Sequence, residues 1–402
     1  MLKLQKDSYE YYFYTCVAWL FTIFSIVVLI IMEAKQFRGG DNVMHWKILA
    51  YTLRGFDPYL NMITQEIPEA VQDIGALDPA WGATPWGLIL GNVYYLGFIS
   101  LDKAKLCFLI LCVVSLVVVL ICLYFKAEKI YDDKRFVFLL IVIALGSTNF
   151  LSAINARNAS GIISCMLLLA WILCDSYPVI TGLLLGIAMS KPQDAALICF
   201  AFLLQKKFLP LIIAAVVDIA AWFYASVLTG SGMIKLLEEF AYLNIIGQHS
   251  SGIFATLISN SSVSMFCSMA TGIILTAICM YYSSHENKNN APKDFSLCFG
   301  YIFTAFWCYS TNTNFYTLLF PIAVCLYFMM KSEKFYQRLF WFGICLFMNG
   351  FRNLSSKVFF YLILGRFPEA NEKSFALTFG YLGLIIIAFI ILFSLTSRKQ
   401  KN

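Results

Sequence analysis

Asp41 is the acidic residue with the most unusual position in the sequence. It follows Gly39 and Gly40 and comes soon after the first long apolar run, 14–32, where the chain leaves an expected membrane-spanning helix. One interpretation is that Asp41 caps the helix expected next, because Asp is strongly favoured at helix N-caps. The other is that a carboxylate held at a membrane surface takes a proton in a reaction. The two interpretations are compatible.

Asp57 and Tyr59 belong to a second polar stretch, Gly55-Phe56-Asp57-Pro58-Tyr59. Its composition is typical of a turn, since Asp is favoured there and Pro restricts φ. We also keep Asp57 and Tyr59 as candidate substrate-binding residues.

Lys191 opens the stretch Lys191-Pro192-Gln193-Asp194, which interrupts an apolar region. Ionisable residues at membrane depth are costly and usually functional. A lysine here can hold a phosphate as a point charge, with Gln193 beside it. The alternative is a capping turn from which Lys191 extends to the membrane surface.

Two further turns, both expected on the outer side of the membrane, carry polar groups. Arg157 and Asn158 come just before an apolar run, and Arg157 either binds a phosphate or faces water. Gln248 and His249 end a long segment expected on the outer face, and His249 is one of three histidines in the chain. Such a cluster suits sugar or phosphate contacts, or is an ordinary solvent-exposed loop.

The composition indicates an integral membrane protein. Of the 402 residues, 60% are hydrophobic and 13% are charged, whereas soluble domains have roughly 45–50% apolar and about 25% charged residues. The 13 cysteines show no CxxC pair, which indicates small buried side chains rather than a zinc or disulfide framework. We expect neither a metal nor another cofactor.

The apolar runs predict an all-α, polytopic bundle of about twelve transmembrane helices, folded as one domain over 1–402. A spanning helix needs about 20 apolar residues. The clear candidates are 14–32, 106–125, 136–150, 208–229, 263–282, 296–310, 315–330 and 376–396. Shorter candidates are 160–174, 178–190, 194–204 and 338–350.

The distribution of charge predicts the orientation. With the N-terminus inside, the inner segments hold more than half of the 29 Lys and Arg residues in a small part of the chain, as the positive-inside rule requires. This places Lys126–Arg135 and both termini in the cytoplasm. The first outer loop then contains an amphipathic, interfacial helix near 42–54, and the apolar run 85–99 is interfacial or re-entrant.

These motifs resemble the GT-C membrane glycosyltransferases. The resemblance rests on Asp41 after the first helix, followed by Trp46 and the Asp57-Pro58-Tyr59 motif. Within that class, 53–59 and 189–193 look like glycosyltransferase family 87, which includes polyprenyl-phosphate-mannose-dependent α-1,2-mannosyltransferases. The Gln248 segment is similar to an Asn-Gln-Ser segment of that family, although Gly247 stands in the place of the Asn.

The resemblance implies an inverting hexosyltransferase that acts at the outer face of the cell membrane. Its donor would be a polyprenyl-phosphate sugar that enters the site from the bilayer. Its acceptor would be a hydroxyl group of a glycolipid or glycan. By this resemblance Asp41 is the general base. Lys191, and more weakly His249 and Arg157, would hold the departing phosphate.

Two other classes fit parts of the pattern. About twelve helices with broken segments also suit a transporter or a flippase for lipid-linked glycans, although no internal repeat is evident. A polysaccharide polymerase or ligase would use the same donor, but its large functional loop is expected later in the chain.

Overall fold

Helices form all the regular secondary structure in the part of the chain that the computed structural model describes, and that part contains no strand. The described residues are 9–35, 42–78, 95–131, 133–147, 151, 154, 159–246, 319–350 and 356–369, with scattered residues within 254–277 and 383–394. The predicted all-α class is therefore confirmed for these residues.

The described helices follow the order α1 (Tyr9–Lys35), α2 (Asn42–Leu53), α3 (Pro58–Thr64), η1 (Glu69–Val71), η2 (Tyr95–Phe98), α5 (Leu101–Ile130), α6 (Lys134–Leu145), α8 (Ser160–Leu173), α9 (Pro178–Ala188), α10 (Pro192–Leu204), α11 (Phe208–Thr229), α12 (Met233–Ile246), α16 (Leu319–Lys331), α17 (Phe335–Asn349) and α18 (Ser356–Leu364).

The helix boundaries agree with the sequence prediction where the chain carries clear end signals. Pro178 and Pro192 occupy the first positions of α9 and α10, where a missing N–H has no cost. Gly230 ends α11 with φ +68°, a left-handed conformation that glycine adopts without strain. The expected helices 263–282, 296–310 and 376–396 fall wholly or largely outside the described residues.

Three described helical segments are long and apolar enough to cross a membrane: Tyr9–Val28, Leu101–Phe125 and Phe208–Thr229. Three shorter apolar helical segments accompany them: Gly161–Leu173, Pro178–Ala188 and Ile322–Lys331. Much of the surface of the long helices exposes large apolar side chains such as Ile212, Val216 and Phe223. Lipid is the environment in which such a surface is stable.

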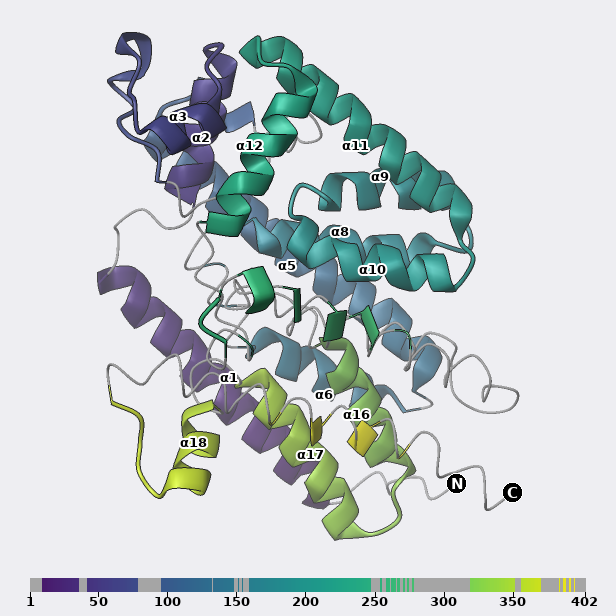
Figure 1. The fold of residues 1–402 in the computed structure, drawn as a ribbon. Helices are drawn as coiled ribbons and strands as arrows, with labels where there is room; N and C mark the ends of the chain where they lie inside the picture. The colour runs from purple at the N-terminus through teal and green to yellow at the C-terminus, as the bar shows by residue number, and fades with distance from the viewer. Residues whose placement is uncertain are drawn as a thin grey trace.

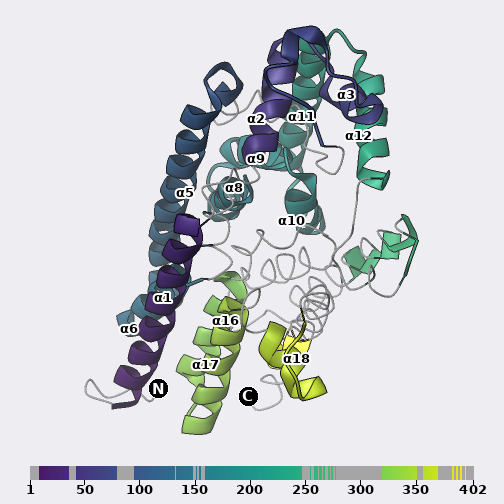
Figure 2. The same cartoon turned by 90° about the vertical axis from the view of Figure 1, so that its left-hand side faces the viewer.

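The described helices form two groups (Figures 1 and 2). One group contains α2, α3 and α8 to α12, and the other contains α1, α6, α16 and α17. The long helix α5 runs alongside both groups and contacts α2, α8 and α6. It therefore connects them.

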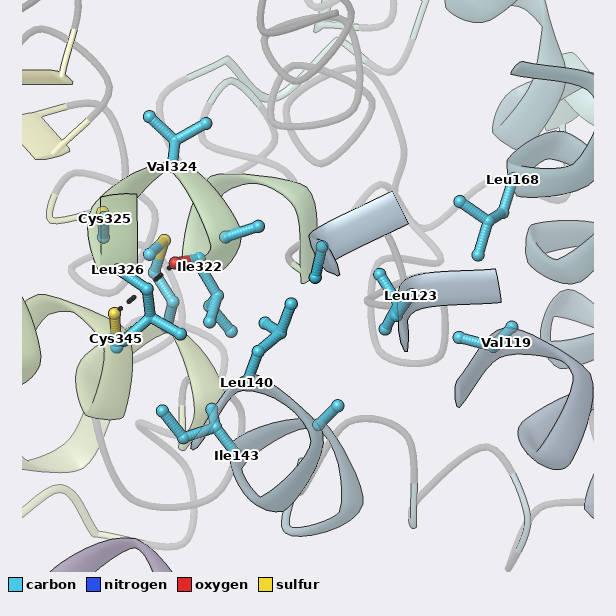
Figure 3. Close-up of a cluster of buried hydrophobic side chains, with 14 of the residues drawn as sticks. Val119, Leu123, Leu140, Ile143, Leu168, Ile322, Val324, Cys325, Leu326 and Cys345 are labelled. Carbon is cyan, nitrogen blue, oxygen red and sulfur yellow. Dashed lines mark hydrogen bonds between the residues drawn. The ribbon is translucent and has the colours of Figure 1, made fainter. Parts of the chain in front are cut away.

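A large buried apolar cluster joins α5, α6, α8, α16 and α17. Figure 3 shows its centre, where Leu140 and Ile143 of α6 lie beside Ile322 and Leu326 of α16. The Cys345 Sγ donates a weak hydrogen bond to the Ile322 carbonyl oxygen at 3.7 Å. As expected, this cysteine behaves as a small buried hydrophobe.

The helices α9 and α11 pack closely because α9 carries two glycines on the contact side. A Cβ atom on Gly182 would lie 2.6 Å from the Cβ of Ile213, and one on Gly186 would lie 2.6 Å from the Cγ1 of Val217. No real Cβ fits at that distance, so any larger residue would separate the two helices.

Charged segments that are far apart in the sequence meet in space. Arg338 at the start of α17 donates to both carboxylate oxygens of Glu10 in α1, at 2.6 and 2.7 Å, and the Arg135 guanidinium lies over the Tyr11 ring. Glu10, Tyr11 and Arg135 lie in or beside the N-terminal segment and Lys126–Arg135, which the charge rule assigned to the inside, and Arg338 contacts Glu10 there. Their meeting at one end of the molecule is what that assignment requires.

The described part of the segment between α1 and α5 packs against α11 and α12. Trp46 of α2 donates its indole N–H to the Ile99 carbonyl oxygen at 2.9 Å, and Arg54 pairs with Asp73 at 2.6 Å. The predicted helix near 42–54 is confirmed as α2. The predicted interfacial run 85–99 lies outside the described residues except for η2 and Ile99.

Candidate active site

Lys191 lies at the break between two short helices. It is the N-cap residue of α10, with φ −129° and ψ 78°, and Pro192 then starts the helix. The side chain of Lys191 is only partly buried. The predicted Pro-broken turn is therefore present, and its lysine is at the start of a helix.

The helix α2 brings His45 to this turn. The His45 ring faces the Phe108 ring of α5, with centroids 6.4 Å apart and planes 25° apart. Burial and, after it, the positive charge of Lys191 lower the pKa of His45 to about 4. The first turn of α2 and the start of α10 are thus close together, and the imidazole between them is neutral at pH 7.

His45 was not among the candidates taken from the sequence. One signal was available. His45 follows Asp41 by four positions, and residues at that spacing share a helix face.

The helices α8 and α10 run in the same direction. The Lys207 ammonium, just after α10, donates to Asp175 Oδ1 at 2.7 Å and to Cys174 Sγ at 2.8 Å, just after α8. The two helices also contact each other, so they start at the same end (Figure 1). The start of α8 at Ser160 therefore lies on the same side as the start of α10.

Five predicted site residues lie outside the described residues: Asp41, Arg157, Asn158, Gln248 and His249. Each is close in sequence to a described helix end. Asp41 directly precedes the first residue of α2, Asn158 comes two residues before the start of α8, and Gln248 comes two residues after the end of α12. Gln193 is in the first turn of α10, and its side chain is also outside the described part.

Asp57 and Tyr59 have structural contacts. Asp57 is the N-cap of α3, and its Oδ1 accepts hydrogen bonds from the backbone N–H groups of Tyr59 at 3.0 Å and Leu60 at 3.1 Å. The Tyr59 side chain is fully buried against the rings of Trp222 and Phe240. The turn predicted at Asp57 is confirmed, whereas contact of these two residues with a substrate stays a prediction.

The Asp57 carboxyl group interacts with that of Glu239, because α12 packs on α3. Glu239 was not recognised from the sequence. Burial and the negative charge of Asp57 raise the pKa of Glu239 to about 7. Nothing in the local pattern of α12 marks Glu239, because only the tertiary packing of α12 on α3 brings the two carboxyl groups together.

One apolar cluster connects the two carboxyl groups to the Lys191 turn. The buried members of this cluster come from α2, α3, α11 and α12. Met189, two residues before Lys191, packs against it. The helices α2, α3, α11 and α12 and the lysine turn are therefore parts of one packed unit.

No group of three or more metal-ligating side chains occurs among the described residues. The expectation of a metal-free site stays a prediction.

The comparison with protein families gives one match. The model of glycosyltransferase family 87 matches residues 93–330, more than half of the chain. The matched region extends from η2 to α16 and contains both Lys191 and Glu239. No curated protein and no solved structure matches the chain.

Proposed function

Because the chain belongs to glycosyltransferase family 87, we propose that it is a hexosyltransferase that uses a polyprenyl-phosphate sugar, mannose-like, as its donor. The acceptor is a hydroxyl group of a glycolipid or glycan, and transfer inverts the anomeric carbon. The observation that carries this proposal is the approach of the first turn of α2 to the Lys191 turn. It brings the start of α2, which directly follows Asp41 in the sequence, close to the lysine.

In the proposed reaction, Asp41 acts on the acceptor. Its carboxylate takes the proton of the acceptor hydroxyl, whose oxygen then attacks the anomeric carbon of the donor. The bond between that carbon and the phosphate oxygen breaks, and the electron pair leaves with the polyprenyl phosphate. No nucleotide and no metal take part in this scheme.

Lys191 acts on the donor. The departing phosphate gains negative charge, and a compact ammonium group neutralises it as a point charge. Because the neighbouring His45 is neutral, Lys191 is the cation of this pair. Arg157 and His249 add weaker contacts to the phosphate, and so does Gln193 from the first turn of α10.

The remaining predicted residues contact the sugar or the acceptor. Asn158 comes just before the start of α8, and Gln248 comes just after the end of α12. Asp57 and Tyr59 shape the wall formed by α3.

The membrane arrangement is part of the proposal. We place the chain in the cell membrane as a multi-pass GT-C bundle of about twelve helices, with the site at the outer face. A lipid-linked donor then enters sideways from the bilayer, and its phosphate meets Lys191 at membrane depth. The meeting of α1, α6 and α17 through charged side chains supports a common inner end. No observation favours the transporter or flippase alternatives.

The decisive experiment is a transfer assay with purified protein in lipid nanodiscs. Radiolabelled polyprenyl-phosphate mannose and candidate glycolipid acceptors are supplied, and a nucleotide sugar replaces the donor in a parallel reaction. We expect labelled product only with the lipid-linked donor. Label from the nucleotide sugar alone would contradict the donor class. Mass spectrometry of the co-purified lipid gives an independent identification.

A further inference from the structure

Two carboxyl groups, one from the start of α3 and one from α12, lie close together where these two helices pack on each other. Asp57, at the start of α3, is 7% exposed, and the side chain of Glu239 is 11% exposed. Asp57 Oδ1 is occupied by two backbone N–H groups. Within the described part of the chain, neither Asp57 Oδ2 nor Glu239 Oε2 meets an N–H or O–H donor. The two groups are nonetheless within hydrogen-bonding reach of each other.

The surroundings leave this pair short of positive charge. From α12 itself, Lys235 lies 3.7 Å from Glu239 Oε1 and is more than half exposed, and such a pair contributes little. From α3, the phenol of Tyr59 is the other titratable group, and burial and the charge of Asp57 raise its pKa well above its usual value. From α11, Trp222 contributes an apolar ring.

The cluster offers one more titratable group, from α2. The Tyr51 hydroxyl donates its proton to the Gly75 carbonyl oxygen at 3.1 Å, away from the pair. Two carboxylates in such surroundings repel each other, and the repulsion disappears when they share one proton.

We propose that Glu239 carries this proton, donates it to Asp57 Oδ2, and so acts as a positioning residue that fastens α12 onto α3. Burial and the Asp57 charge, which raise the pKa of Glu239 to about 7, agree with this assignment. The consequence for catalysis depends on the proposed function, because α12 leads directly into the segment that contains Gln248 and His249. The fastening itself does not depend on it.

The pH dependence of stability has a definite sign. Between the ordinary pKa of 4.5 and about 7, the folded state keeps the proton while the unfolded state loses it. The contribution of Glu239 to stability therefore falls as pH rises through this range and levels off above it. The corresponding change in the unfolding equilibrium constant is roughly a few hundredfold.

The test compares Glu239→Gln with Glu238→Gln. The neighbouring Glu238 is exposed, so the second variant makes the same chemical change outside the pair. Gln donates a hydrogen bond to Asp57 at every pH. Across this pH range the stability of Glu239→Gln relative to wild type should rise with pH, because only the wild type loses the Glu239 contribution, whereas the difference between Glu238→Gln and wild type should stay constant. The same pH dependence in all three proteins would overturn the proposal.

A second variant separates fastening from simple packing. Glu239→Ala cannot donate, so it should melt below Glu239→Gln throughout the range. Equal melting of Gln and Ala variants would also overturn the proposal.

The activity arm uses the transfer assay on the same proteins. If Glu239 positions the outer segment, Glu239→Gln should keep its acceptor KM above pH 7, where the acceptor KM of the wild type rises. An acceptor KM that changes equally with pH in both proteins would contradict the positioning role. Absence of transfer with every lipid donor, together with the expected melting curves, would reject the proposed function and leave the shared proton intact.

Discussion

The imidazole of His45 lies close enough to the ammonium of Lys191 for that charge to lower its pKa, although one residue is on α2 and the other starts α10. Burial is the larger cause of the shift. The ring is therefore neutral at pH 7 and adds no second positive charge beside the lysine. A single cation next to a neutral ring that accepts or donates a hydrogen bond is well suited to a phosphate that arrives and leaves.

Lys191→Ala should weaken donor use specifically. Loss of the ammonium removes the charge that balances the departing phosphate, so we expect a raised donor KM or no turnover, with the acceptor KM nearly unchanged. Steady-state kinetics with each substrate varied in turn will measure this. Lys191→Arg should restore activity poorly, because a planar guanidinium does not replace a compact ammonium.

The matched control for this lysine is Lys206→Ala. Lys206 is exposed at the opposite end of α10, and its removal should leave both KM values unchanged. Wild-type donor kinetics in Lys191→Ala would remove the lysine from the donor site.

His45→Gln should reduce the loss of stability in acid. The folded-state pKa of about 4 lies below the ordinary value of 6.5, so between these values only the unfolded state binds the proton. Stability therefore falls as pH drops from 6.5 to about 4. Gln cannot be protonated, so the variant should lose this part of the decline in a melting series.

Lys191→Gln tests the cause of the shift. Because burial contributes more than Lys191 does, removing the lysine should reduce the acid decline only in part. Complete loss of the decline in Lys191→Gln would mean that the charge, rather than burial, dominates. This acid effect has the opposite sign to that of Glu239, and the two glutamine variants separate them.

The sequence was sufficient to predict the helices that carry their own signals. The segment 208–229 is a run of apolar residues between Lys207 and Gly230, and α11 has those bounds. The helices α9 and α10 were expected over 178–190 and 194–204 and begin at Pro178 and Pro192. The helix after Asp41 was expected from its amphipathic pattern. In each case the information is local, so periodicity and end signals reveal it.

The candidate site was predicted only in part, because its remaining members depend on tertiary packing. Lys191 was recognisable as a charge in an apolar region. His45 became relevant only through the packing of α2 on α5 and its approach to Lys191, and Glu239 only through the packing of α12 on α3. No local pattern encodes which helix covers which, so these residues required the structure.

The proposed topology predicts selective labelling from outside the cell. In a cysteine-free background, a single cysteine in place of the exposed Glu69 of the first loop should react with an impermeant thiol reagent. A cysteine in place of Lys134, whose side chain is 82% exposed, should react only after the membrane is opened. Labelling of position 134 in intact cells would reverse the orientation and move the proposed site to the inner face.

Asp41→Asn should abolish most of the transfer while leaving the fold unchanged. Asn caps helices about as well as Asp, so the start of α2 should keep its stability. Asn cannot take a proton, and general-base assistance typically contributes about 10²–10⁴-fold in rate. We therefore expect transfer to fall by at least about two orders of magnitude, with the melting temperature and the donor affinity close to those of wild type.

Asp102→Asn is the control for this change. Asp102 is an exposed acidic residue in the first turn of α5, so the substitution removes the same charge near a helix start without touching the proposed site. Its transfer rate should match wild type. If Asp41→Asn is equally active, Asp41 only caps α2, and the base must be sought among the other ionisable groups of the outer loops, beginning with Asp57, Glu66 and His249.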